Sequence, residues 1–476
     1  MQVSRRGFVT GLAATGLGLA APPSIAQAQV SSSEAYVQAA QLGGDVGFVV
    51  MDARSGQVLE QRHPDLHMPP ASTAKTVTTL YALETLGTDY RFGTRLIATG
   101  PVVGGVIQGD LVLSGGADPT LSTDDLGAMA AELSRIGVRG ITGRFLVWGG
   151  AIPYAEEIAR DQPVYVSYNP AVSGLILNFN RVYFAWKRAG NGYQVTMDAP
   201  GDAYKPRAYT ASMTVAARQA PLFSYSDRGG KEQWSVAASA LGRSGSRWLP
   251  VRHPVAYAGD VFQTLARSQG CPLPAAEEAR SQPAGTVLVT HASHRLPDIL
   301  EDMLKYSTNL TAEAVGMTSS TVRGLPASVG RSGASMSQWI AARAGTQAID
   351  LVDHSGLGGN SRVTPLDMVR VMAAGQPVGL RNLVKPFKMR DASGKTYASQ
   401  PFRVDAKTGT LNFVSTLTGY MTAPNGRELV FSILTGDVDR RRRTQDEDRP
   451  AGSVQWVKRS KILQSQLLMR WGAVYG

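Results

Sequence analysis

Proline and glycine signals divide the chain into an α/β pattern that is interrupted by a long β-rich stretch. From residue 93, strand patterns punctuated by glycine dominate, and a proline-rich linker at 272–283 closes them. Mixed helix and strand patterns precede and follow this stretch. We therefore expect an α/β (α+β) domain, split by a β-rich insertion that holds up to two subdomains. The expected boundaries are 29–92 plus 284–476 for the split domain and 93–283 for the insertion.

Hydrophobic periodicity places several elements in this frame. Residues 45–52 indicate a strand, and a helix is expected over 72–86, directly after a Pro-Pro pair. Residues 402–421 indicate strand structure, and the Ser/Gly-rich segment 225–249 is typical of a loop. The segment 453–471 has apolar residues at helical spacing, and we expect this helix to dock against a sheet, with a membrane-surface helix as the alternative.

Composition excludes several classes of protein. The chain has 476 residues, of which 43% are hydrophobic and 18% charged, so it can bury several cores and is no disordered scaffold. Its net charge of +11 attracts anions in general. No zinc-finger or RNP-like pattern supports nucleic acid as a partner. With a lone cysteine, Cys271, and six scattered histidines, we expect no disulfide, no metal and no cofactor.

The N-terminus predicts an export signal. Arg5 and Arg6 form a positive segment, residues 10–21 are weakly hydrophobic, and an A-x-A site ends at Ala28. The paired arginines are similar to a twin-arginine signal. We expect residues 1–28 to be removed and the mature protein to be periplasmic, with at most peripheral membrane contact.

The first of three polar motifs places a serine and a lysine on one helix face. Ser72-Thr73-Ala74-Lys75 stands at the start of the helix expected over 72–86, and residues three apart on a helix share a face. Serine needs a base to act as a nucleophile, and a lysine whose pKa is lowered by desolvation or by a second cation can serve. Alone, the motif is more typical of a capping serine with a solvated lysine.

The second motif is Ser307-Thr308-Asn309, between two helical patterns. In a non-helical stretch the hydroxyl and the amide can point into one cleft, where the hydroxyl can relay a proton and the amide can hold a carbonyl. Alone, this motif is more typical of a polar turn between helices.

The third motif is the strand segment K-T-G-T at 407–410. Lys407 can attract a carboxylate and lower the pKa of Lys75, and Gly409 would let a ligand backbone approach the strand edge. The N–H groups of Thr410 and Ser72 could form an oxyanion hole. The simpler interpretation is a strand with an exposed lysine.

In this order, the three motifs resemble those of the penicillin-recognising serine peptidases. The long separation of the first two is similar to that of the class C low-molecular-mass penicillin-binding proteins, which are D-alanyl-D-alanine carboxypeptidase/endopeptidases. The resemblance implies a β-lactamase/transpeptidase-like fold. Supporting stretches are P-A-S-T-A-K at 70–75, G-D-L-V-L-S-G-G-A-D-P-T-L at 109–121, Y-S-T-N-L-T-A-E at 306–313, D-H-S-G-L at 353–357 and D-A-K-T-G-T-L at 405–411.

The resemblance implies a role for each motif residue. Ser72 would be acylated by a D-Ala-D-Ala peptide with Lys75 as base, and Ser307 with Lys407 would carry the proton to the leaving amine. Asn309 would hold the substrate. The further substrate-binding residues would be Thr408, Gly409 and Thr410. The implied partners are peptidoglycan stem peptides and β-lactam inhibitors; the sequence predicts no oligomeric state.

Two other activities remain open on the same motifs. A β-lactamase or esterase would need fast deacylation, and the sequence shows no acidic residue placed to activate water. A penicillin-binding sensor or wall-binding module would acylate without turnover. Release of D-alanine separates the leading interpretation from both alternatives.

The chain departs from the family pattern near its D-H-S-G-L stretch. Family members often carry an arginine that reaches the acidic side chain of diaminopimelate, whereas this chain has Gly359 at that position and Arg362 three residues later. We therefore expect weak selection of the third stem-peptide residue, unless Arg362 or the segment 157–171 supplies an anchor. The basic run Arg440–Arg443 is typical of a solvated loop with local ion pairs, with glycan or lipid contact as the alternative.

Overall fold

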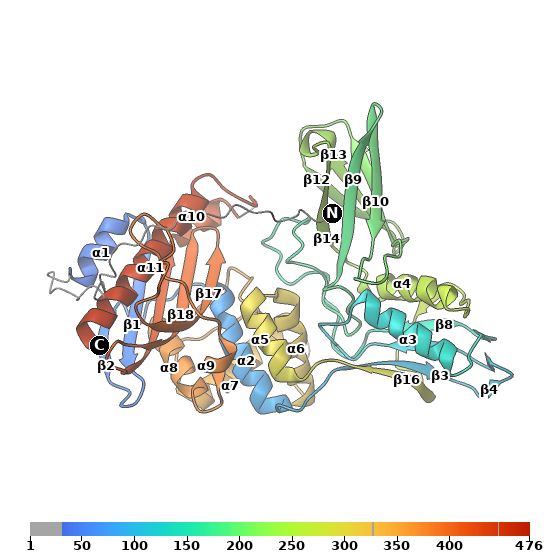
Figure 1. The fold of residues 1–476 in the computed structure, drawn as a ribbon, viewed down its shortest axis with the longest axis horizontal. Helices are drawn as coiled ribbons and strands as arrows, with labels where there is room; N and C mark the ends of the chain where they lie inside the picture. Colours follow the sequence, from blue (N-terminus) through green and yellow to red (C-terminus); the bar gives the residue numbers. More distant parts are fainter. Residues whose placement is uncertain (1–30, 326–327, 446) are drawn as a thin grey trace, which may run out of the picture.

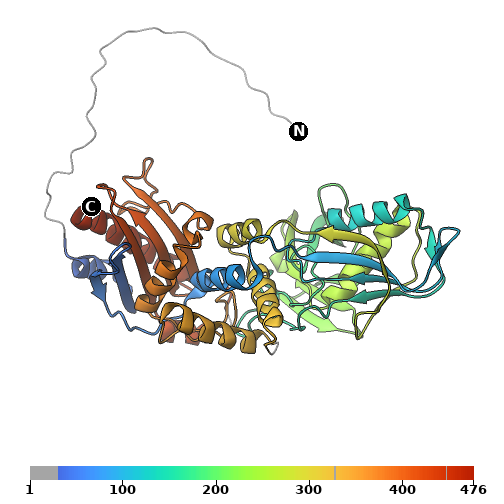
Figure 2. The same ribbon diagram turned by 90° about the horizontal axis from the view of Figure 1, so that it is seen from below.

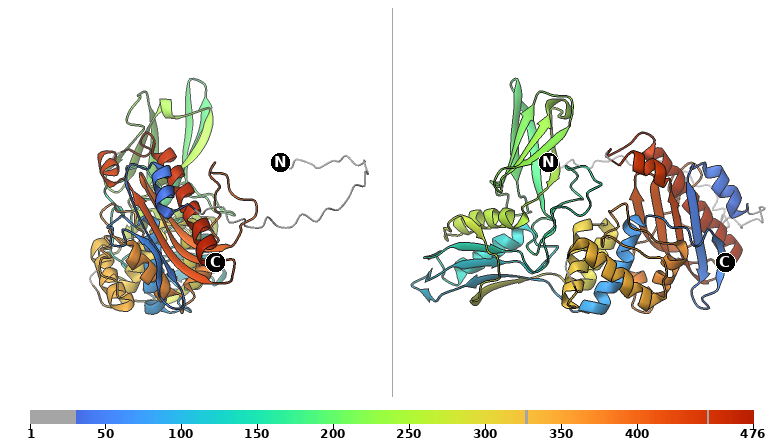
Figure 3. Two further views of the ribbon diagram at one scale, coloured as in Figure 1. Left: turned by 90° about the vertical axis from the view of Figure 1, so that its left-hand side faces the viewer. Right: turned by 180° about the vertical axis from the view of Figure 1, so that it is seen from behind.

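The computed structural model describes residues 31–325, 328–445 and 447–476. The predicted signal peptide, with its cleavage site after Ala28, lies outside the described residues. Figure 1 shows two lobes side by side, with helices α5 and α6 between them. The same two lobes are seen from below in Figure 2 and from the side and behind in Figure 3. One lobe is built from both ends of the described chain and the other from its middle.

The first lobe is organised around a five-stranded antiparallel sheet. Its strands, in spatial order, are β17 (Arg403–Leu411), β18 (Val414–Thr422), β19 (Glu428–Gly436), β1 (Asp45–Asp52) and β2 (Val58–Arg62). Both faces of the sheet are covered, which explains why β1 is an almost continuous apolar run rather than an alternating one. Val49 and Met51 pack in one core, while Phe48 and Val50 pack in the core on the opposite face.

Two groups of helices cover this sheet. Helices α1 (Ser33–Ala40) and α11 (Ser453–Tyr475) lie on one face, where Trp456, Leu463 and Leu467 of α11 are buried, so the predicted docking of this helix is confirmed. The other face meets the larger group, which carries Ser72, Lys75 and Asn309 of the predicted site. Its members are η1 (Ala71–Ala74), α2 (Lys75–Leu86), α5 (Leu296–Tyr306), α6 (Asn309–Val322), α7 (Val329–Ala344), α8 (Pro365–Gly375) and α9 (Leu380–Leu383).

The second lobe is rich in β structure and has a core of its own. Its main sheet has five strands, and helices α3 (Thr123–Arg135) and α4 (Pro254–Ser268) pack beside it. In spatial order these strands are β15 (Ala276–Glu278), β8 (Phe145–Trp148), β6 (Leu111–Ser114), β3 (Gly93–Ala98) and β16 (Thr286–Ala292). A small sheet at the edge holds β4 (Val102–Val103), β5 (Val106–Ile107) and β7 (Gly140–Ile141).

Two further three-stranded sheets rise from this lobe in Figure 1. One holds β9 (Arg181–Ala189), β10 (Gly192–Asp198) and β14 (Ser244–Pro250), and the other holds β11 (Ala211–Ala216), β12 (Phe223–Asp227) and β13 (Glu232–Ala237), followed by η2 (Ala238–Ala240). The fold class is therefore mixed α/β, as expected. The division into domains remains a prediction. Strand β16 pairs with β3 although the expected boundary, residue 284, assigns it to the flanking domain.

Two segments differ from the expected secondary structure. The stretch 402–421 is not one strand, because the chain reverses at Asn412 and Phe413, the latter with a positive φ of 57°, and forms the β17–β18 hairpin. The expected loop 225–249 is wrong, since β13 and most of β14 lie within it. Some of its serines and glycines, among them Ser235, Ser244 and Gly245, occupy strand positions whose pairing with neighbouring strands outweighs their low β propensity.

Candidate active site

Ser72 lies in a short 3-10 turn that leads directly into the helix carrying Lys75. η1 spans Ala71–Ala74 and α2 begins at Lys75. Ala71 has a φ of 47°, in the left-handed region that costs energy for a residue with a side chain. The protein holds the residue before Ser72 in this conformation by packing on both sides of the turn, which fixes the direction of the serine.

Lys75 is fully buried and makes three polar contacts. Its Nζ lies 3.0 Å from Ser72 Oγ, 2.8 Å from Asn309 Oδ1 and 2.8 Å from the carbonyl oxygen of Ser355. The amide and carbonyl oxygens can only accept hydrogen bonds. When Lys75 is neutral, its two N–H bonds therefore go to these oxygens, and its lone pair is left for the hydroxyl of Ser72.

Burial lowers the pKa of Lys75 to about 7, while the nearby carboxyl groups of Asp353 and Glu313 act in the opposite direction. The expected lowering by a second cation is not the main cause. The two carboxyls are also buried, and burial raises the pKa of Glu313 to about 8 and that of Asp353 above its usual value. Lys75 can therefore be neutral near physiological pH without an unpaired charge in the core.

Ser307 and Lys407 meet next to this group. Ser307 ends α5 with a φ of 60°, and its Oγ lies 2.9 Å from Lys407 Nζ. Lys407 is buried, and burial together with the charge of Lys75 lowers its pKa well below the usual value. The expectation of an exposed lysine, the simpler interpretation of the third motif, is thus wrong. A hydroxyl and an ammonium in contact can pass a proton.

Asn309 joins the two lobes at the site. Its Oδ1 accepts from Lys75, and its Nδ2 donates to the backbone carbonyl of Tyr168, 3.0 Å away in a loop of the second lobe. This second contact fixes which end of the amide faces Lys75. Tyr168 carries no motif, and sequence reasoning missed it.

Strand β17 is an edge strand, and its free part begins at the third motif. The first half of its edge is occupied, since Ala406 N–H donates to Lys385 O and Phe387 N–H donates to Val404 O. Backbone groups alternate in direction along an antiparallel strand. The N–H and C=O groups of Thr408 and Thr410 therefore face the same edge, where an extended peptide could add as a further strand. Of these groups, the carbonyl of Thr408 already accepts from Lys407 Nζ, 2.8 Å away.

Gly409 has a different role from the one expected. A Cβ at this position would lie 2.2 Å from Thr416 Oγ1 and 2.8 Å from Pro70 O. The glycine thus makes room for the turn that carries Ser72, not for a ligand. Gly356 serves the same turn from the other side, because its φ is 73° and a Cβ there would lie 1.9 Å from Ala71 O.

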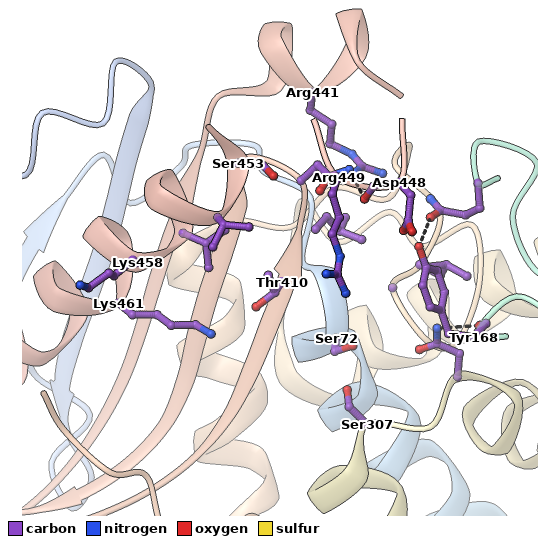
Figure 4. Close-up of a pocket in the computed structure, with 18 of the residues that line it drawn as sticks. Ser72, Tyr168, Ser307, Thr410, Arg441, Asp448, Arg449, Ser453, Lys458 and Lys461 are labelled. Carbon is purple, nitrogen blue, oxygen red and sulfur yellow. Dashed lines mark hydrogen bonds between the residues drawn. The ribbon is translucent and has the colours of Figure 1, made fainter. Parts of the chain in front are cut away.

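These residues open into a cavity of about 690 Å³. Figure 4 shows Ser72 and Ser307 at its floor, Thr410 beside them, and Tyr168 on the side of the second lobe. Arg441 and Arg449 come from above, with the side chain of Arg449 directed toward Ser72. The cavity is also lined by Gln162, Asn309, Gly356, Leu357, Arg390, Leu411, Asn412, Asp448, Ser453, Val454, Val457, Lys458 and Lys461.

The structure brings in an arginine that sequence reasoning did not single out. Arg362 donates to the carbonyls of Gly359 and Ser361 and lines a separate cavity of about 460 Å³. Arg441 lines both this cavity and the Ser72 cavity, and its Nη2 lies 3.1 Å from Asp161 Oδ2. Asp161 also accepts from the N–H of Gly359, and a Cβ at Gly359 would lie 2.8 Å from its carboxylate.

The expectation for the basic run is therefore wrong for Arg441. The run belongs to helix α10 (Val438–Arg443), in which the exposed Arg442 pairs with Asp439, as a solvated segment would, but Arg441 is buried. Arg440 stacks on Phe413, with its guanidinium carbon 4.1 Å from the ring centroid. Asp161 holds Arg441 in place, and it lies in the segment 157–171 that was expected to supply an anchor as the alternative to Arg362.

Within residues 31–325, 328–445 and 447–476, no group of three or more His, Cys, Asp or Glu side chains is placed to hold a metal ion. The same described residues contain no helix that is both long and apolar enough to span a bilayer. Cys271 is buried in the second lobe, and burial raises the pKa of its thiol.

Comparison with known proteins gives a consistent result. The model of the D-Ala-D-Ala carboxypeptidase 3 (S13) family matches residues 28–459. A D-alanyl-D-alanine carboxypeptidase of Actinomadura sp. (strain R39) is 29% identical over 430 residues, which are 82% of this chain and 78% of that protein. D-alanyl-D-alanine carboxypeptidase DacB of Haemophilus influenzae is 25% identical over 432 residues, which are 83% and 87% of the two chains.

Among solved structures, penicillin binding protein 4 (dacB) of Haemophilus influenzae matches with a TM-score of 0.73 and 20% identity, covering 92% of this chain and 99% of that one. The same protein complexed with a novel β-lactam matches with a TM-score of 0.71 and 22% identity. At this identity the likeness shows a shared fold, which includes both lobes because nearly all of each chain is covered.

Proposed function

Because the chain belongs to the D-Ala-D-Ala carboxypeptidase 3 (S13) family, we propose that it is a serine D-alanyl-D-alanine carboxypeptidase/endopeptidase acting on peptidoglycan stem peptides. The observation that carries the proposal is the set of three contacts of Lys75. They leave its lone pair for the hydroxyl of Ser72, and burial lowers its pKa to about 7. A serine and a matched base in contact are the core of acyl-enzyme chemistry.

The proposed reaction begins with attack by Ser72. Its Oγ adds to the carbonyl of the penultimate D-alanine while Lys75 takes the hydroxyl proton. The developing oxyanion is stabilised by the N–H groups of Ser72 and Thr410, the second of which faces the open strand edge. Attack at this edge orients the peptide along β17.

Collapse of this intermediate expels the leaving amine. Ser307, in contact with Lys407, passes a proton to the amine as its C–N bond breaks. The leaving group is free D-alanine in the carboxypeptidase reaction and a neighbouring peptide in the endopeptidase reaction. In this proposal Thr408 and Thr410 bind the D-alanine carboxylate next to Lys407, and water then hydrolyses the acyl-enzyme. β-Lactams would acylate the same serine and inhibit the enzyme.

The products of purified muropeptide monomers and dimers test this function. Mass spectrometry is expected to show loss of one D-alanine from pentapeptide monomers and conversion of cross-linked dimers to monomers. A β-lactamase, an esterase or a sensor that acylates without turnover would release no D-alanine. Absence of D-alanine from both substrates would therefore contradict the proposal.

Arg441 changes the expectation for the third stem-peptide residue. A charge-assisted contact with a side-chain carboxylate contributes about 1.5–3 kcal/mol, or about one to two orders of magnitude in kcat/KM. With Arg441 in the cavity, we expect the wild type to prefer the free carboxylate over its amide by about tenfold or more. Arg441→Ala is expected to remove the preference and Arg362→Ala to retain it. Equal kcat/KM values for both peptides with the wild type would contradict this role.

Export is a further prediction. We propose that the protein reaches the periplasm through a twin-arginine signal and that the mature chain begins at Gln29. Replacing Arg5 and Arg6 by lysine is expected to leave the precursor in the cytoplasm, as measured by fractionation and N-terminal sequencing. Normal periplasmic amounts of mature protein after this change would instead indicate the general secretory route.

A further inference from the structure

One wall of the Ser72 cavity is basic and comes from elements outside the three motifs. It consists of Arg390, Lys458 and Lys461, which we call the basic wall. Figure 4 shows the side chain of Lys461 extending from α11 toward Thr410. Among the described residues, no carboxylate pairs with any of the three, and the carboxylate that lines the cavity, Asp448, lies on the opposite side near Tyr168.

Within this wall the charge of Arg390 acts on Lys461. The pKa of Lys461 is lowered by burial and by the charges of Arg390 and Lys385, and Lys385 also acts on Lys407. Arg390 donates to the carbonyl of Gly394, which holds it near α11. Two cations kept close together at the rim of a cavity, here Arg390 and Lys461, without a neighbouring carboxylate, favour the binding of an anion.

The direction in which the peptide runs along β17 determines which of its carboxylates can reach the basic wall. The leaving amine must lie where Ser307 and Lys407 can protonate it, on the side of Ser72 where these two residues meet. The acyl part of the peptide then runs the other way, past Thr410 toward the end of β17. Leu411 and Asn412 line the cavity there, next to the basic wall.

The spacing of residues along an extended peptide determines which residue of the substrate lies beside the basic wall. An extended chain advances about 3.3–3.6 Å for each residue. The third stem-peptide residue, directly before the attacked D-alanine, is expected beside Thr410 and Arg441. The residue before it is therefore the one that arrives at the end of β17.

We propose that the basic wall is a second carboxylate subsite, which binds a free carboxylate on the residue that precedes the third stem-peptide residue. The subsite rests on the proposed function, because the direction of the peptide follows from the assignment of Ser307 and Lys407. It is separate from Arg441, which lies on the other side of the cavity.

Matched peptides test this subsite. Two D-Ala-D-Ala peptides would differ only in having a free carboxylate or its amide on the second residue, and kcat/KM would be measured from released D-alanine. The wild type is expected to prefer the free carboxylate by about tenfold, the lower end for a charge-assisted contact, because the wall is partly solvated. Lys461→Gln is expected to lose most of this preference, because kcat/KM falls much more for the free carboxylate than for the amide.

Controls separate the subsite from other effects. Lys388→Gln removes one exposed positive charge nearby without changing the cavity and is expected to keep the preference. The rate of acylation by a penicillin, which has no carboxylate at the position of the second stem-peptide residue, is expected to change no more in Lys461→Gln than in Lys388→Gln. A larger change in that rate, or equal loss of activity on both peptides, would show damage to the fold and overturn the inference.

The outcomes also separate this inference from the proposed function. If the wild type releases D-alanine from both peptides at equal rates, the subsite is wrong and the function stands. If it releases none from either peptide, the proposed function fails, and the subsite fails with it. If Arg441→Ala loses the preference and Lys461→Gln keeps it, the carboxylate is bound on the opposite side of the cavity and the subsite is wrong.

Discussion

Replacing Ser72 by alanine is expected to abolish the covalent adduct with a fluorescent penicillin and to reduce peptidase turnover by about four orders of magnitude or more. Ser72 Oγ is the hydroxyl that Lys75 contacts, at 3.0 Å, and the adduct requires this oxygen. Intact-mass analysis of the wild type is expected to show one adduct, on the peptide that contains Ser72. Labelling that survives Ser72→Ala would contradict the assignment.

Lys75→Ala is expected to give nearly the same loss, because a nucleophile and its base act as a unit. The variant keeps Ser72 but removes the group that takes its proton, and with it the contact to Asn309. Ser393→Ala is a suitable control, since Ser393 is an exposed serine in a turn whose hydroxyl contacts only Asp391 and the backbone N–H of Lys395 among the described residues. Near-UV circular dichroism would show whether each variant keeps its packing.

The motif residues could be predicted because local geometry decides part of their arrangement. Ser72 and Lys75 share a helix face through their spacing alone, and the structure has their side chains in contact. Their meeting with Ser307, Asn309 and Lys407 depends on contacts between distant parts of the chain. The sequence predicted it only through the family resemblance. The catalytic roles of these residues remain a proposal.

Other parts of the site could not be read from the sequence, because they depend on packing between distant loops. Arg441 lies in a run of four arginines, and only its contact with Asp161 distinguishes it from its neighbours. Tyr168 contributes a backbone carbonyl, which any residue has, so no side-chain pattern reveals it. Gly409 was assigned to ligand approach, although the space above it is filled by the turn that carries Ser72.

The cause of the low pKa of Lys75 shows the same limit. The sequence placed a second lysine in the third motif and suggested that its charge acts on Lys75. In the structure burial is the main cause, and burial depends on how α2, α6 and the loop at Ser355 close over the side chain. Charge can be counted in a sequence, whereas desolvation appears only when the elements are packed.

The second large effect is expected in the pH dependence of acylation. Burial lowers the pKa of Lys75 to about 7, and only the neutral amine can accept the proton of Ser72. The neutral fraction is one half at the pKa and about one hundredth two pH units below it, so kcat/KM is expected to drop about fiftyfold between pH 7 and pH 5. A midpoint near 4, typical of a carboxyl group, would contradict Lys75 as the base.

The alkaline side of the profile reports on Lys407. Burial and the charge of Lys75 lower the pKa of Lys407 well below its usual value, so it loses its proton at a lower pH than an exposed lysine does. Deprotonation removes both the attraction for the substrate carboxylate and the proton supply through Ser307, and kcat/KM should fall again. Lys407→Arg keeps the charge at every accessible pH. A guanidinium does not give up a proton to Ser307, so kcat/KM of this variant is expected to be lower at every pH. The alkaline fall is expected to disappear while the acid limb stays, because the acid limb belongs to Lys75.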